Sequence, residues 1–255
     1  MPLGTLSLKA EANPIFAPPY PKHHDPYTFS IDKVLSISYR VAASQVRHLV
    51  PDVLELEDEP LVTTMFLEYG MSSVGVYKEF GHNVEVRHPG TGEKFRYNII
   101  LILDNESAIF AGREQYGFPK VFGRADIKTE NGTRLIMANT ERPAGNTLVE
   151  AEFIPDTRLP DSAAAAAAAA SGQHWFLNLR TIEQPHPGCA PQILELVPVG
   201  FEMKPAEVWT GKGNLHFPRS SAQNPWCGLD VLRYEGSIYL KNVTAVLKVR
   251  GSLPM

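Results

Sequence analysis

One lysine in this sequence lies among apolar residues in a way that could support carbonyl chemistry. Residues 117–123 read Gly-Phe-Pro-Lys-Val-Phe-Gly, and Lys120 has no acidic residue directly beside it. A lysine attacks a carbonyl only as the free amine, and at the reference pKa of about 10.4 roughly one lysine in 2,500 is neutral at pH 7. Burial among apolar groups favours the neutral amine, because the ammonium is poorly solvated there. Lys120 is therefore a candidate Schiff-base residue, activated by an apolar pocket that lacks a carboxylate partner.

The same residue types also fit a simpler interpretation. A surface lysine can lay its methylene stem over apolar neighbours such as Phe118 and Val121. On local composition alone this interpretation is favoured, because most lysines lie at the surface. In either case Pro119 fixes its own φ angle, and the glycines at 117 and 123 permit sharp turns. The segment is predicted to be a stiff loop that presents the lysine.

The elements that must position this lysine are predicted to be β-strands. Residues 34–41 alternate between apolar and polar types, which is the period of a half-buried strand. Residues 44–50 fit a short capped helix ended by Pro51, and Asn131-Gly132 is a strong hairpin signal. Further strands are predicted at 61–69, 73–80, 94–103, 121–128, 133–140, 147–153, 175–181, 192–209 and 234–249.

About ten strands with few helices predict a mainly β (α+β) fold. A closed or nearly closed antiparallel barrel would protect the edges of so many strands. Five prolines within residues 14–26 predict that residues 1–27 form an extended N-terminal arm, and residues 28–255 are expected to form a single domain. Within the strand at 73–80, Gly75, Tyr77 and Glu79 share one face, because side chains repeat every two residues.

Composition and charge limit the classes of function. The chain has 255 residues and a formal net charge of -4, which excludes a broad basic surface for nucleic acid. No secretory signal or membrane-spanning apolar run is visible, so a cytoplasmic protein without membrane contacts is expected. Cys189 and Cys227 can form at most one disulfide and match no metal-binding pattern.

Two further segments of the sequence carry no functional signal. His23-His24-Asp25 lacks the spacing of a zinc site, so no metal is expected there. The alanine run at 163–170 has two interpretations. It is either true sequence that forms a short helix capped by Ser162, or a run of placeholder residues for a poorly defined loop. No function is assigned to either segment.

Three motifs, in order along the chain, resemble the acetoacetate decarboxylase family. Residues 77–81 read Tyr-Lys-Glu-Phe-Gly, and residues 103–114 read Leu-Asp-Asn-Glu-Ser-Ala-Ile-Phe-Ala-Gly-Arg-Glu, followed by Gly-Phe-Pro-Lys. Residues 207–211 read Glu-Val-Trp-Thr-Gly, with Leu-Glu-Leu upstream at 194–196. The similarity runs with gaps from about residue 14 to 250. This similarity favours a Schiff-base lysine over a surface lysine at position 120. Activation of such a lysine is a known example in this family.

The resemblance implies a set of site residues and a fold. Lys120 falls on the family's Schiff-base lysine and Glu79 on an active-site carboxylate, while Tyr77 shares the strand face of Glu79. Phe118 and Tyr116 are expected to contact the substrate. The implied fold is a mainly antiparallel barrel or cone that forms homo-oligomers, and the implied chemistry needs no cofactor.

The sequence departs from the family pattern at three positions. The family has a second lysine directly after the reactive one, where this chain has Val121, so desolvation alone is expected to activate Lys120. A second family carboxylate falls by ungapped count on Thr64, and Glu68 lies four residues further on the same strand face. The group that replaces it is left open.

The family's active-site arginine has no counterpart at its expected place, near residues 32–33. Arg40 and Arg113 are the nearest candidates, and Arg113 is taken as a candidate for substrate binding. Glu114 beside it is expected to have a structural role, as is Glu207 in the late motif.

These observations favour a lyase that forms an imine between Lys120 and a ketone and decarboxylates a β-keto acid. Two alternatives remain. A Schiff-base aldolase, dehydratase or cyclase would act on a larger keto compound, and a non-catalytic barrel would bind a small molecule without turnover. The expected partner is a small keto acid or ketone, and the sequence does not identify it.

Overall fold

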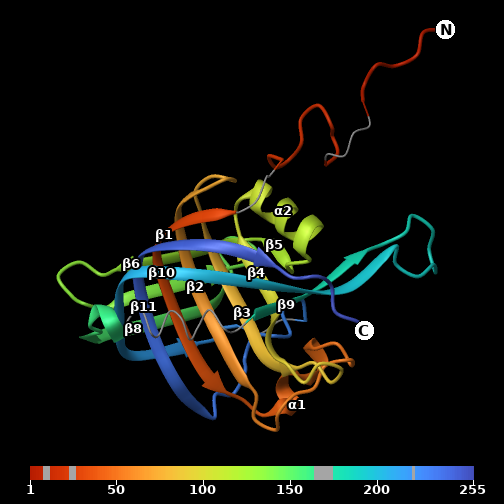
Figure 1. Ribbon diagram of the computed structural model, residues 1–255. Helices are drawn as coiled ribbons and strands as arrows, with labels where there is room; N and C mark the ends of the chain where they lie inside the picture. The colour runs from red at the N-terminus through yellow and green to blue at the C-terminus, as the bar shows by residue number, and fades with distance from the viewer. Residues whose placement is uncertain (8–11, 23–26, 164–174, 220–221) are drawn as a thin grey trace.

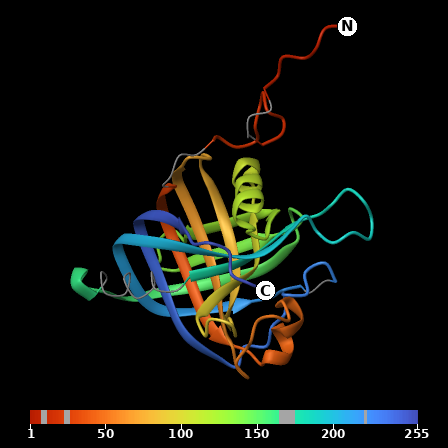
Figure 2. The ribbon, with the colours of Figure 1, turned by 45° about the vertical axis from the view of Figure 1, so that its right-hand side comes forward.

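A closed ring of strands dominates the computed structural model, which describes residues 1–7, 12–22, 27–163, 175–219 and 222–255 (Figure 1). The helices α1 (Ala43–Val46) and α2 (Glu106–Tyr116) lie at opposite ends of the ring in both views (Figures 1 and 2). A 3-10 turn, Arg47–Leu49, follows α1. The strands are β1 (Thr28–Arg40), β2 (Leu61–Ser72), β3 (Tyr77–Arg87), β4 (Lys94–Leu103), β5 (Lys120–Phe122), β6 (Arg124–Thr129), β7 (Ile136–Glu141), β8 (Thr147–Arg158), β9 (Trp175–Ile182), β10 (Ile193–His216) and β11 (Arg233–Val249).

The ring closes because β10 is long enough to pair with three neighbours. Its first part pairs with β9, its middle with β11 and its last part with β8. The order β11-β1-β2-β3-β4-β9-β10 therefore returns to β11, while β8-β7-β6 extends from the ring as a separate flap. Most pairings are antiparallel, as expected, but β4 pairs in parallel with both β5 and β9.

Side chains on the ring strands point alternately into the main core and into the cavity. On one face of β2 and β3, residues such as Phe66 and Phe80 pack with Ile127, Leu148 and Phe153 from the flap and form the main core. On the other face, alternate residues of the same strands point into the ring, where the site lies. Period-two alternation therefore assigns each side chain either to packing or to the cavity.

Most predicted strands are confirmed, and several boundaries are corrected. The strand expected at 73–80 begins only at Tyr77, because Gly75 has a positive φ of 95° in the turn before it. The strand expected at 121–128 is two strands that meet at Gly123. The helix expected at 44–50 begins at Ala43, and no side chain caps it.

Helix α2 is not anticipated by the sequence reasoning, although it has clear end signals. The Asn105 side chain accepts a hydrogen bond from the backbone of Ala108, as an N-cap does. Gly117 ends the helix in the left-handed conformation, with φ at 69°. A Cβ there would also lie 2.7 Å from the backbone of Arg180, so only glycine fits. Lys120 consequently follows a helix and begins a strand, and does not lie on a free loop.

The described parts of the N-terminal arm extend away from the barrel (Figure 1). Close to the barrel, Pro19 and Tyr20 of the arm contact α2. The hydroxyl of Tyr20 donates to Glu114 at 2.6 Å, and Ser107 donates to the carbonyl of Pro19. The paired histidines at 23 and 24 lie outside the described residues, as does the alanine run beyond residue 163. Both cysteines are free thiols; Cys189 is exposed and Cys227 is buried.

None of the described helices is long and apolar enough to span a membrane.

Candidate active site

Lys120 is fixed from two sides at the start of β5. Its backbone pairs with Leu101 of β4, and its side chain packs beneath α2, where Gly112 leaves space for the methylene stem. The guanidinium of Arg113 donates to the backbone carbonyl of Lys120 at 3.1 Å. Only 8% of Lys120 is exposed, so its ammonium points into the protein and not into solvent.

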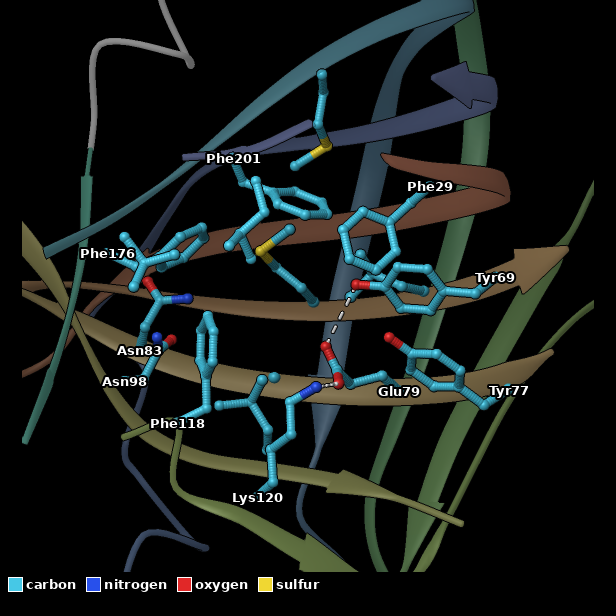
Figure 3. Close-up of a pocket in the computed structure, with 17 residues that line it drawn as sticks. Phe29, Tyr69, Tyr77, Glu79, Asn83, Asn98, Phe118, Lys120, Phe176 and Phe201 are labelled. Carbon is cyan, nitrogen blue, oxygen red and sulfur yellow. Dashed lines mark hydrogen bonds and ion pairs between the residues drawn. The ribbon is translucent and has the colours of Figure 1, made fainter. Parts of the chain in front are cut away.

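A carboxylate meets this lysine inside the ring (Figure 3). Oε2 of Glu79, on β3, lies 2.8 Å from Nζ of Lys120, and Glu79 is only 4% exposed. The expectation of an apolar pocket without a carboxylate partner is therefore wrong. Sequence distance hides this contact, because 41 positions separate two residues that the β3-β4-β5 pairing brings together.

Two tyrosines flank Glu79 on the side away from Phe118 (Figure 3). Tyr69 and Tyr77 are stacked with ring centroids 4.3 Å apart, and the Tyr69 hydroxyl donates to Glu79 Oε1 at 3.4 Å. Burial, reinforced by the charge of Glu79, holds the pKa of both phenols well above its ordinary value. Both hydroxyls are therefore neutral hydrogen-bond donors at physiological pH. Tyr69 is not predicted as a site residue, although alternation along β2 places it on the cavity face.

Apolar side chains form most of the remaining walls. The cavity has a volume of about 70 Å³, which is space for several waters, since one water needs roughly 10–15 Å³. All seven strands of the ring contribute to its lining, which includes four phenylalanines: Phe29, Phe118, Phe176 and Phe201. A smaller chamber of about 40 Å³ lies under α2 and shares Lys120 with the main cavity.

The expected substrate contacts divide between these spaces. The ring centroid of Phe118 is 5.5 Å from Nζ, and Phe118 borders both chambers. Tyr116 lines only the smaller chamber. Arg113 lines neither chamber, because it bonds the Lys120 carbonyl instead. Tyr77 and Glu79 lie beside the lysine, as the resemblance implies.

The candidate replacements for the missing family groups point elsewhere. Thr64 is on the core face of β2, where it bonds His82 Nδ1 at 3.0 Å, and Glu68 pairs with Lys33 at 2.8 Å. Arg40 pairs with acidic side chains at the far end of β1. Among the described residues, the main cavity is lined by no arginine and by one carboxylate, Glu79.

The remaining motif residues have the structural contacts that were expected. Glu207 accepts from the Trp209 indole at 3.0 Å and lies 3.6 Å from Lys241. Glu114 accepts from Tyr20, and its backbone carbonyl accepts from Arg180. Val121, in place of the second lysine, packs against the main core.

Two asparagines that no sequence pattern singles out complete the cavity. Asn83 and Asn98 are on β3 and β4, beyond Phe118 from Glu79 (Figure 3). They face each other because a β-bulge changes the register between His82 and Asn83. Hydrophobic periodicity does not reveal a bulge, so Asn98 would be assigned to the wrong face from sequence.

Comparison with known proteins finds similarity over nearly the whole chain. The family model for acetoacetate decarboxylase (ADC) matches residues 12–251. The chain is 36% identical over 228 residues to Decarboxylase DEC1 of Cochliobolus heterostrophus, a match covering 89% of this chain and 87% of that protein. It is 32% identical over 240 residues to Acetoacetate decarboxylase 1 of Mesorhizobium japonicum, which covers 92% and 91% of the two chains.

Solved structures share the fold. A structure described as "Structural Studies of Acetoacetate Decarboxylase" superposes with a TM-score of 0.81 at 24% identity, over 97% of this chain and 98% of that one. The enduracididine biosynthesis enzyme MppR, complexed with the condensation product of pyruvate and imidazole 4-carboxaldehyde, gives a TM-score of 0.68 at 18% identity. That match covers 91% of this chain and 90% of MppR. This chain belongs to the acetoacetate decarboxylase family.

Proposed function

We propose that the protein is a cofactor-free lyase that forms a Schiff base between Lys120 and a β-keto acid and decarboxylates it. The observation that carries this proposal is the buried Lys120–Glu79 pair, 2.8 Å apart in a cavity with mostly apolar walls. Transfer of one proton from Nζ to Oε2 gives a free amine and a neutral acid without changing the net charge of the site. The amine attacks the ketone, and Glu79 returns the proton to the carbinolamine oxygen as water leaves.

The protonated imine then serves as the electron sink. The bond between the α-carbon and the carboxylate breaks, its electron pair enters the enamine, and carbon dioxide leaves. Glu79 collects a proton from solvent and delivers it to the α-carbon, and water then releases the ketone from Lys120. In sum, one β-keto acid anion and one proton give one ketone and one carbon dioxide.

The walls favour this bond cleavage. A substrate carboxylate meets no arginine on the described lining of the main cavity. A carboxylate that is poorly solvated is costly to hold. Its departure as neutral carbon dioxide, with its electron pair neutralising the iminium, is therefore favoured in this cavity. Tyr69 holds Glu79 by a hydrogen bond from its neutral hydroxyl, and the neutral Tyr77 stacked on Tyr69 adds no charge to the site.

Borohydride trapping tests the proposal. The protein is incubated with acetoacetate and with a bulkier aromatic β-keto acid, reduced, and mapped by mass spectrometry. An adduct on Lys120 and release of carbon dioxide are expected, and Lys120→Ala should lose both while staying folded. The matched control is Lys78→Ala, whose lysine pairs with Asp126 at 2.5 Å, away from the cavity. Turnover by Lys120→Ala would overturn the covalent mechanism.

A second candidate keeps the imine but not the decarboxylation. A substrate without a carboxylate beside the ketone would also fit the described lining, which has no arginine. MppR, captured with a condensation product, shows that this fold can hold such chemistry. An aldolase, dehydratase or cyclase would give the Lys120 adduct without carbon dioxide. A non-catalytic binding barrel would give neither the Lys120 adduct nor carbon dioxide. The expected homo-oligomer is a separate proposal, which sedimentation tests.

A further inference from the structure

The end of the cavity remote from Glu79 is made of amides. Asn83 and Asn98 are cross-strand partners on β3 and β4, and both line the main cavity (Figure 3). In a regular strand, alternation from Leu101 would turn Ile99 inward and Asn98 outward. The bulge beside them reverses this and brings Asn98 to the cavity face. Bulges near sites commonly redirect a side chain in this way.

Hydrogen bonding fixes one of these amides and leaves the other available. Asn98 Nδ2 donates to Asn178 Oδ1 at 2.8 Å, and Asn178 Nδ2 donates to the Tyr116 carbonyl at 3.0 Å. This series of hydrogen bonds sets the orientation of the Asn98 amide, because the backbone carbonyl of Tyr116 can only accept a hydrogen bond. Asn83 is 2% exposed, and its Oδ1 has no hydrogen-bond partner in the part of the chain that is described.

A buried amide oxygen without a partner is costly, so its retention on a cavity wall points to a ligand. The ligand group must donate a hydrogen bond to Asn83 Oδ1. A carboxylate cannot do so, since it is acceptor-only, and it would be repelled by the amide oxygen. A hydroxyl group donates and accepts, and it carries no charge into a cavity with apolar walls.

The geometry also places this group relative to the reacting carbon. Lys120 pairs with Leu101, which pairs with Gly81, so the lysine lies level with Gly81 on β3. Asn83 is two residues further, about 6.6 Å along the strand. Between them the wall is open, because a Cβ on Gly81 would meet only Leu101, at 4.0 Å. A carbon chain can extend along this wall, past Phe118, from the imine to the amides.

We infer that Asn83 is a specificity-determining residue that binds a hydroxyl group of the substrate, with Asn98 held beside it. The substrate class is a β-keto acid whose chain carries a hydroxyl several bonds beyond the ketone, on the side away from Glu79. This inference rests on the proposed Schiff-base function, because it assumes that the ketone is held at Lys120.

Matched substrates test it. A series of straight-chain β-keto acids of increasing length is compared with analogues whose terminal methyl is replaced by a hydroxyl of similar size. At one chain length kcat/KM should favour the hydroxyl compound by about tenfold or more, as expected for a buried polar group that gains its partner. In Asn83→Leu, which keeps the side-chain size, this preference should vanish, so that kcat/KM for the hydroxyl compound no longer exceeds kcat/KM for the methyl compound measured in the same variant.

A control and a second readout separate the possible failures. Met203→Leu changes an apolar cavity residue and should affect both compounds of a pair equally. Binding of the matching hydroxy-ketone and alkyl ketone, measured by calorimetry, reports on Asn83 without turnover. No hydroxyl preference at any length, in rate or binding, would overturn the inference even if Lys120 forms its adduct. A preference in binding without any adduct would support Asn83 and refute the proposed chemistry.

Discussion

Replacing Gly112 by alanine is expected to displace the reactive lysine without unfolding the protein. A Cβ at this position of α2 would lie 2.7 Å from Cδ and 2.9 Å from Cε of Lys120. Carbon atoms in contact are normally about 3.5–4.0 Å apart, so the stem must retreat by about 1 Å. The stem is flexible and can move, while alanine in place of glycine stabilises a helix by roughly 1 kcal/mol. The fold is therefore retained, and the 2.8 Å contact between Nζ and Glu79 is lost.

The expected cost falls on the reaction. Misplacement of a reacting group by about 1 Å can lower a rate by about 100-fold, which corresponds to about 2.7 kcal/mol. Gly112→Ala should lower kcat/KM by about ten- to 100-fold, measured with the β-keto acid that gives the highest yield of the reduced Lys120 adduct. The melting temperature should be unchanged or raised. Phe110→Ala is the control, because it introduces alanine on the exposed side of the same helix. Wild-type rates in Gly112→Ala would refute the view that α2 positions the amine.

Three further changes probe the site and its support. Glu79→Gln removes the proton acceptor beside Nζ, and kcat should fall by about 10²- to 10⁴-fold in a carbon dioxide assay. Arg113→Gln removes the bond to the Lys120 carbonyl; kcat should fall several-fold with KM unchanged, whereas a raised KM would indicate substrate binding. His82 is buried, and desolvation lowers its pKa from 6.5 to about 3. The unfolded chain therefore binds more protons between these values, so the free energy of unfolding falls as pH drops below about 6.5. His82→Leu should flatten this slope by up to about 1.4 kcal/mol per pH unit in urea denaturation, and an unchanged slope would contradict a neutral His82.

Patterns that act locally along the chain predict much of the fold. Alternation locates the strands, because each ring strand has one face in the main core and the other in the cavity. It also places Tyr77 and Glu79 together, as observed. The strand before Tyr77 is misjudged, since Gly75 interrupts extended backbone that the neighbouring apolar residues would otherwise permit.

Features that depend on contacts between distant strands are not predictable in this way. The Lys120–Glu79 contact requires β5 to pair in parallel with β4, a pairing off the ring that local sequence patterns do not indicate. The direction of Arg113 depends on how α2 packs over β5. Asn98 faces the cavity only because of a bulge, so composition and period give no indication of it. The resemblance points to Lys120 and Glu79, and the predicted Tyr77 and Phe118 also line the cavity, whereas Tyr69, Asn83 and Asn98 are not predicted as site residues.

The replacement of the family's second lysine by Val121 changes how a free amine can arise. A neighbouring cation favours the amine by repulsion, whereas Val121 packs into the main core and supplies no charge. In the proposed mechanism Glu79 takes the proton instead, so the nucleophile and the acid needed to expel water form in the same step. The two functions are then inseparable at one carboxylate. A substitution at Glu79 should therefore slow imine formation as well as turnover, and borohydride trapping of Glu79→Gln at short times measures that step directly. Trapping at the wild-type rate would show that the lysine loses its proton by another route.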